Sequence, residues 1–101
     1  VYRGMQYFGG PVRYVLGGSG HIAGVVNPPA SGKYQFWADG PLSGTFDEWF
    51  SHATETKGSW WPDWLMWLTS QAPAKVAARA PGDGALPVLG DAPGDYVRVK
   101  V

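Results

Sequence analysis

Short apolar runs separated by glycine and proline divide the first part of the chain into small elements. Residues 1–8 mix aromatic and polar side chains and end at Gly9-Gly10-Pro11, which predicts the last turns of a helix. Residues 12–16 are rich in Val, Tyr and Leu, and a run this short favours a buried strand. Residues 33–38 indicate another short strand.

The middle of the chain begins with a helix signal. Thr45 and Glu48 have the spacing of a capping box, which marks a helix N-terminus. The following apolar residues recur at helical spacing, and the pattern predicts a helix that ends near Gly58. Its apolar face would consist of Phe46, Trp49, Phe50 and Ala53.

A second helix is predicted after Ser59, which can cap its first turn. Its apolar residues exceed the single stripe of an ordinary surface helix, so the pattern predicts contacts on two sides. The stripe is Trp61, Trp64, Leu65 and Leu68, widened by Trp60 and Trp67. Aromatic residues at this spacing are more often core than a ligand platform.

The last third of the chain has a different composition. Residues 73–94 are dominated by Ala, Pro and Gly without a sustained period, which predicts a linker. Residues 95–101 alternate polar and valine positions, which predicts a C-terminal edge or half-buried strand.

Composition and charge exclude several classes of function. Eight basic and eight acidic residues cancel, and the basic ones are scattered, so nucleic acid is not an expected partner. No apolar run approaches the length of a membrane span. The absence of cysteine excludes a disulfide, a thiolate metal site and a thiol nucleophile in this chain. Because the first residue is valine, we expect a fragment of a longer protein.

His21 is the main candidate for chemistry. It follows Gly17-Gly18-Ser19-Gly20 at a predicted strand end, where glycines allow a loop to present one side chain, and its pKa class suits proton transfer. From spacing alone, however, a structural histidine is the more common interpretation. His52 is interpreted as structural.

Other site types find little support. Ser19 lacks the G-x-S-x-G context of a nucleophile, and the glycine loop has neither a Walker lysine nor a dinucleotide fingerprint. The two histidines lie far apart and share no ligand spacing with a carboxylate. We therefore predict no metal and no cofactor.

Two long motifs carry a resemblance to a known family. They are Gly18-Ser19-Gly20-His21-Ile22-Ala23-Gly24-Val25-Val26-Asn27-Pro28-Pro29 and Gly58-Ser59-Trp60-Trp61-Pro62-Asp63-Trp64. In this order they closely resemble the C-terminal region of class I polyhydroxyalkanoate synthases, also called poly-beta-hydroxybutyrate polymerases. The terminal segment from Ala92 to Arg98 is also similar, which leaves only residues 74–91 outside the resemblance.

The resemblance implies an α/β fold, as the C-terminal portion of an α/β-hydrolase with the last core strand, the histidine loop and the following helices, incomplete on its own. Residues 1–72 would belong to that catalytic domain. The family's triad would consist of His21 with a Cys nucleophile and an Asp that both precede Val1. Asp39, Asp47 and Asp63 follow His21, so none occupies the family's acid position.

The implied activity is acyl transfer from an (R)-3-hydroxyacyl-CoA, which lengthens a polyester and releases CoA. His21 would take the thiol proton and return a proton to the departing CoA sulfur. The chain alone, without Cys and Asp, is expected to be inactive. The family also suggests a homodimer, a cytoplasmic location and polymer granule surfaces.

Two alternatives remain open. A non-catalytic fragment or interaction module would give the same residues. Another α/β-hydrolase, an esterase or depolymerase, would also place a histidine after a strand, although the Gly-Ser-Trp-Trp-Pro motif argues against it.

Overall fold

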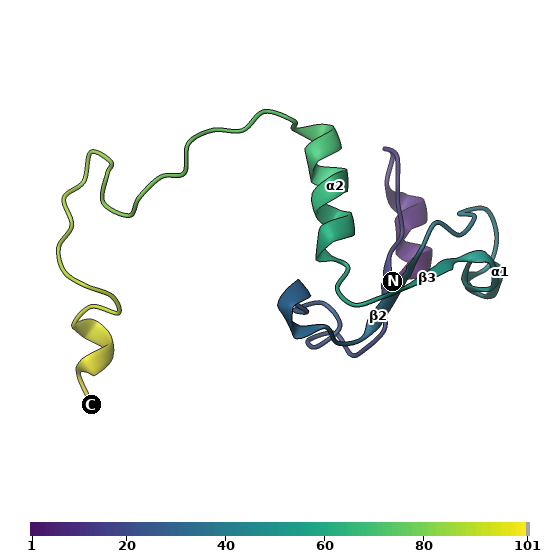
Figure 1. Cartoon of the computed structure of the whole chain (residues 1–101), viewed down its shortest axis with the longest axis horizontal. Coiled ribbons are helices and arrows are strands. Elements are labelled where there is room, and N and C mark those ends of the chain that lie inside the picture. The colour runs from purple at the N-terminus through teal and green to yellow at the C-terminus, as the bar shows by residue number, and fades with distance from the viewer. Residues whose placement is uncertain (101) are drawn as a thin grey trace.

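The computed structural model describes residues 1–100, and most of its regular structure lies before residue 72 (Figure 1). The order of elements is η1 (Tyr2–Tyr7), β1 (Leu16–Gly17), η2 (Pro29–Ser31), β2 (Gln35–Ala38), α1 (Phe46–His52), β3 (Thr54–Lys57), α2 (Trp61–Gln71) and η3 (Tyr96–Arg98), where η denotes a 3-10 helix. The helical turns predicted for residues 1–8 are therefore present, as a 3-10 helix.

A sheet of three antiparallel strands in the order β1-β2-β3 organises this region. The strand predicted at 33–38 is confirmed as β2, which pairs Phe36 with Thr56 and Ala38 with Thr54. The strand predicted at 12–16 is much shorter, because only Leu16 and Gly17 pair with β2. The residues before Leu16 pack with their side chains instead of pairing.

Helix α1 begins as predicted and ends earlier than predicted. The Thr45 hydroxyl accepts from the Glu48 N–H, and the Glu48 carboxylate accepts from the Thr45 N–H, so both halves of the capping box form. The predicted end near Gly58 is wrong, since the helix stops at His52 and residues 54–57 form β3. Pairing with β2 outweighs the local helical period there.

The core is small and aromatic. Trp49 is fully buried, and Tyr2 and Met5 of η1 pack against it. The Tyr14 ring meets Trp49 edge-on at 4.7 Å between centroids. Partly buried apolar residues complete the cluster: Val12, Tyr14, Leu16, Trp37 and Ala53. This cluster lies between η1, α1 and the sheet.

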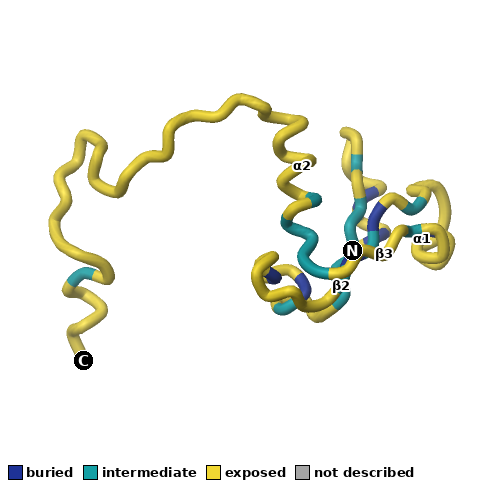
Figure 2. Tube along the Cα trace, in the orientation of Figure 1, coloured by how far each residue is buried: buried dark blue, intermediate teal, exposed yellow. Residues whose placement is uncertain are grey.

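Helix α2 runs away from the sheet (Figure 1), and it is exposed along most of its length (Figure 2). None of its residues is buried, and Leu65 and Met66 are 62% and 68% exposed. Hydrogen bonds with the preceding residues reach only the start of α2, so residues 1–100 do not cover the helix on two sides as predicted.

The segment after α2 forms no helix or strand before Tyr96 within the described residues, and it runs away from the sheet (Figure 1). At its end the structure has η3 where a strand is predicted for 95–101. The physical reason is that no described strand lies beside it, so the amides of Arg98 and Val99 bond locally to Asp95 and Tyr96. Val101, the last residue of that prediction, lies outside the described residues.

The extended tail makes the molecule large for its length. The radius of gyration is 19.6 Å, whereas about 13 Å is expected for a compact domain of this size. Within residues 1–100, no helix is long and apolar enough to span a membrane.

Candidate catalytic-histidine loop

His21 lies on an exposed loop directly after β1. The Gly18 N–H donates to the Gln35 carbonyl at 2.7 Å, which ties the start of this loop to β2. Residues 20–26 then form the histidine turn, in which the Gly24 N–H donates to the Gly20 carbonyl and the Val26 N–H to the Ile22 carbonyl, both at 2.8 Å. His21 occupies the second position of this turn, and its side chain is open to solvent. The ring is therefore accessible to a reacting group.

Two of the glycines are required by close backbone contacts. A Cβ on Gly18 would lie 2.6 Å from the Gln35 carbonyl oxygen. A Cβ on Gly24 would lie 2.6 Å from the Ser19 carbonyl oxygen. The loop can fold this tightly only because neither residue carries a side chain.

Helix α2 contacts the end of the histidine turn through its first two tryptophans. The indole N–H groups of Trp60 and Trp61 donate to the Val25 carbonyl at 3.0 and 2.9 Å. The Ser59 hydroxyl accepts from the Trp61 N–H. Pro62 lies in the first turn of α2, where backbone N–H groups have no partner within the helix, so its missing N–H costs no hydrogen bond. The Gly-Ser-Trp-Trp-Pro motif thus joins a helix start to the histidine loop.

The Asn-Pro-Pro motif closes the next turn of the chain. Asn27 is buried, and its amide donates to the Lys33 carbonyl at 2.9 Å while its oxygen accepts from the Ser31 hydroxyl at 2.8 Å. Pro28 caps η2 and Pro29 begins it, and η2 lies between Asn27 and Lys33 in the chain. Asn27 therefore holds the return from the histidine turn to β2.

Arg13 forms an ion cluster that the sequence analysis missed. Its guanidinium bonds to both carboxylate oxygens of Asp63 and to one oxygen of Asp39. The pKa of Arg13 is raised, chiefly because its guanidinium donates hydrogen bonds to the Asp63 carboxylate, so the group stays cationic. Asp39 holds a left-handed backbone with φ of 64°, a conformation that Asp tolerates. Partners 26 and 50 residues away leave no local signal that could have revealed the cluster.

The other sequence candidates lie elsewhere. His52 ends α1, where its Nδ1 is 2.9 Å from the Glu48 carbonyl oxygen and 3.0 Å from the Ser51 hydroxyl. Ser19 is exposed beside His21. Among residues 1–100 no group of three or more His, Cys, Asp or Glu is placed to hold a metal ion.

Two open grooves meet at Val15, just before β1, and one of them adjoins the histidine loop. One of about 230 Å³ lies between the loop and Trp60 and is lined by Val15, Gly17, Gly24, Val25 and Trp60. A second of about 350 Å³ lies between the segment before β1 and α2, where Arg13 and Asp63 stand beside Trp64 and Trp67. Val15 and Trp60 line both grooves.

Comparison with known proteins finds no matching family model, but it finds close relatives along nearly the whole chain. The chain is 58% identical over 101 residues to the poly(3-hydroxyalkanoate) polymerase of Methylorubrum extorquens, covering 99% of the chain and 17% of that protein. It is 53% identical over 97 residues to the poly(3-hydroxyalkanoate) polymerase subunit PhaC of Rhizobium etli, covering 96% of the chain and 15% of that protein. The corresponding subunit of Cupriavidus necator is 45% identical over 101 residues, covering 99% of the chain and 17% of that protein. The chain thus spans about a sixth of the length of the curated relatives it matches.

Proposed function

We propose, from the premise that this chain is a segment of the poly(3-hydroxyalkanoate) polymerase family, that it supplies His21 as the proton carrier of a polyester-forming acyltransferase. The substrate would be an (R)-3-hydroxyacyl-CoA thioester and the products a lengthened polyester and free CoA. A cysteine and an aspartate elsewhere in the intact enzyme would complete the triad, within an α/β-hydrolase fold to which β1 and the histidine loop contribute.

The proposed steps keep atoms and charge in balance. His21 accepts the proton of the cysteine thiol, and the thiolate attacks the thioester carbonyl. The carbon–sulfur bond to CoA breaks, and the imidazolium returns its proton to the leaving CoA sulfur. A hydroxyl group at the end of a growing chain or of a second monomer then attacks the acyl-enzyme. The new ester forms as the carbon–sulfur bond to the cysteine breaks, and the proton of the attacking hydroxyl passes to the cysteine sulfur, which regenerates the thiol.

The observation that carries this proposal is the identity of 45 to 58% along nearly the whole chain together with an exposed His21. A histidine that must meet a thiol and an acyl group on another part of the enzyme has to be accessible. Its loop is also short and hydrogen-bonded to β2, so the backbone that carries the ring is ordered.

The chain by itself should have no polymerase activity, because it contains no cysteine. The resemblance also supports association of the intact enzyme with polymer granules in the cytoplasm, and a homodimer, as parts of the same proposal. No bound cofactor is required by these steps.

The test uses a chimeric enzyme, in which this chain replaces the matching segment of the Methylorubrum extorquens polymerase. His21→Ala should lower CoA release from 3-hydroxybutyryl-CoA by about a thousandfold, since general acid–base groups contribute on this scale. His52→Ala is the matched control, because His52 is also an exposed histidine, and activity should remain within about twofold.

Two results would count against the proposal. Retention of polymer synthesis by His21→Ala would remove His21 from the chemistry. Release of CoA by the unmodified chimera without accumulation of polyester would instead favour ester hydrolysis, the activity of the related hydrolase class.

A further inference from the structure

The carbonyl of Val25 accepts two indole hydrogen bonds at once. Trp60 and Trp61 are adjacent in the chain, yet both Nε1 atoms lie within 3.0 Å of this one oxygen. A carbonyl oxygen has two lone pairs, so both donors can be satisfied together. Because two bulky side chains bind the same backbone oxygen, the two tryptophans hold the Val25 carbonyl in place.

Val25 belongs to the same small turn as His21. Within this turn the Gly24 N–H donates to Gly20, and the Val26 N–H donates to Ile22 at 2.8 Å. These bonds make residues 20–26 one locally connected unit. A force on the Val25 carbonyl is therefore transmitted to the backbone of His21, four residues earlier.

The His21 ring forms no side-chain hydrogen bond with the described part of the chain. Among residues 1–100 no hydrogen bond reaches its imidazole, whereas His52 contacts two oxygen atoms. The position of the His21 ring is consequently set by its backbone. That backbone is held before the turn by Gly18 on Gln35 and after it by the contacts to Val25.

The donors themselves are fixed to the rest of the fold. Trp60 is the N-cap of α2 and Trp61 its first residue, and Asp63 two positions later is bonded to Arg13. Asp63 is only 16% exposed in its side chain. The start of α2 is thus joined to the segment before β1, and this contact fixes the backbone from which the two indoles extend.

We propose that Trp60 and Trp61 are positioning residues for His21, acting as a paired donor that fixes the Val25 carbonyl and hence the histidine turn. This inference rests on the proposed function, because it assigns to the tryptophans a role in placing the histidine of that reaction. Neither indole needs to touch the substrate. Each donor partly replaces the other, so the pair should respond to mutation as a unit.

The experiment compares Trp60→Phe, Trp61→Phe and the double variant in the chimeric enzyme described above. Each single change leaves one donor on Val25, and kcat should fall by about threefold or less. The double change removes both donors and should lower kcat by about tenfold to a hundredfold, since loss of alignment at a reacting centre costs this much. KM should stay within about twofold in all three.

A second measurement separates placement of the histidine from general loosening. The rate at which the catalytic thiol is alkylated by iodoacetamide near neutral pH reports the histidine–thiol pair, because the thiolate is the reactive form. It should fall in the double variant as it does in His21→Ala. Trp67→Phe is the control, since Trp67 lies on the same helix without an indole hydrogen bond among residues 1–100, and it should leave both rates unchanged.

The double variant can fail to fold, because two large rings are shortened. In that case Trp61 is replaced by benzothienylalanine in the Trp60→Phe background, which keeps the ring volume and removes the last N–H. A loss of kcat and of thiol alkylation in this variant supports the proposal. A normal rate of thiol alkylation together with a normal kcat, in either variant that lacks both indole N–H groups, overturns the proposal.

The outcomes also distinguish this inference from the proposed function. If His21→Ala abolishes activity and the variants without indole donors behave as the unmodified chimera, only the positioning role fails. If His21→Ala itself is active, the proposed function fails, whatever the tryptophan variants do.

Discussion

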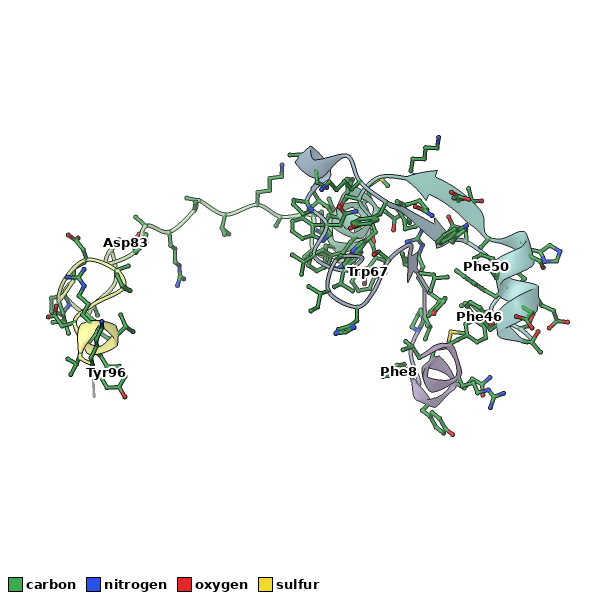
Figure 3. All side chains as sticks on the ribbon, turned by 90° about the horizontal axis from the view of Figure 1, so that it is seen from below. Phe8, Phe46, Phe50, Trp67, Asp83 and Tyr96 are labelled. Carbon is green, nitrogen blue, oxygen red and sulfur yellow. The ribbon has the colours of Figure 1, made fainter. Side chains whose placement is uncertain are left out.

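The region before residue 72 and the tail after it differ in what their side chains can bury. Among residues 1–100, all five buried hydrophobic residues lie from Tyr2 to Trp49. In residues 72–100 no residue is buried, and Figure 2 shows the tail exposed along nearly all its length. Figure 3 shows Asp83 and Tyr96 far from the aromatic side chains of Phe46 and Phe50.

The difference shows what makes a core in so short a chain. The three short antiparallel strands and the two 3-10 helices before residue 58 supply little area, so aromatic rings provide most of the contact. The tail has alanine, proline and glycine, which bury little apolar surface and cannot offset the entropy of ordering the backbone. The site therefore depends on the first region alone.

The largest expected contrast comes from Trp49→Ala against Leu89→Ala. Trp49 is fully buried, and its loss should lower the stability of the first region by about 3–5 kcal/mol through cavity formation. Leu89 is 96% exposed, and its loss should change stability by less than about 0.5 kcal/mol. Hydrogen exchange at the amides of β2 in the chimeric enzyme measures both. If the two substitutions lowered stability equally, the tail would have to pack against the region before residue 72.

A smaller contrast is expected between two arginines. Arg13→Met leaves Asp63 without its cationic partner in a largely covered position and should cost about 2 kcal/mol. Arg79→Met changes an exposed tail residue and should have an effect below about 0.5 kcal/mol. The same exchange measurement, read at the first turn of α2, reports the difference. If hydrogen exchange at the first turn of α2 is unchanged in Arg13→Met, the ion cluster does not stabilise the start of the helix.

The smallest effect concerns the cap of α1 and its dependence on pH. Hydrogen bonds from the Thr45 N–H and hydroxyl hold the pKa of Glu48 below its ordinary value of 4.5. Since the folded-state pKa is the lower one, this stabilisation is complete above 4.5 and is lost as pH falls through the folded value.

Thr45→Ala should therefore cost about 1 kcal/mol at neutral pH and remove the acid dependence of α1. Titration of the α1 amide signals by nuclear magnetic resonance measures this. The control is Asp83→Asn, which alters the tail turn where Asp83 accepts from the Ala80 N–H and should leave α1 unchanged. A cap whose pH response survives Thr45→Ala would contradict the assigned hydrogen bonds.

Predictions that depended on local chemistry agree with the structure. The capping box at Thr45 and Glu48, the strand over 35–38 and the helix after Ser59 are each encoded within one turn or one short run. Predictions that needed a distant partner were less successful. The helix expected to reach Gly58 ends at His52, and the strand expected at 95–101 is a 3-10 turn at Tyr96–Arg98.

His21 could be identified from the sequence, but its support could not. The glycines beside it and the motif that contains it are visible in the residue order. The two tryptophans that donate to Val25 are 35 and 36 positions away from it in the chain. The sequence pattern assigned them only to the apolar face of the second helix. The role of His21 in catalysis stays a prediction until the histidine variant is measured.

Neighbouring residues were enough to predict where α1 and α2 begin, which segment lacks a core and which histidine lies on a glycine loop, because these features are local. Only the tertiary structure decided that residues 54–57 join β2, that Arg13 meets Asp39 and Asp63, and that two indoles hold the Val25 carbonyl. Such contacts join residues far apart in the chain, and they form only when the core has brought those residues together. The spacing of neighbouring residues therefore cannot predict them.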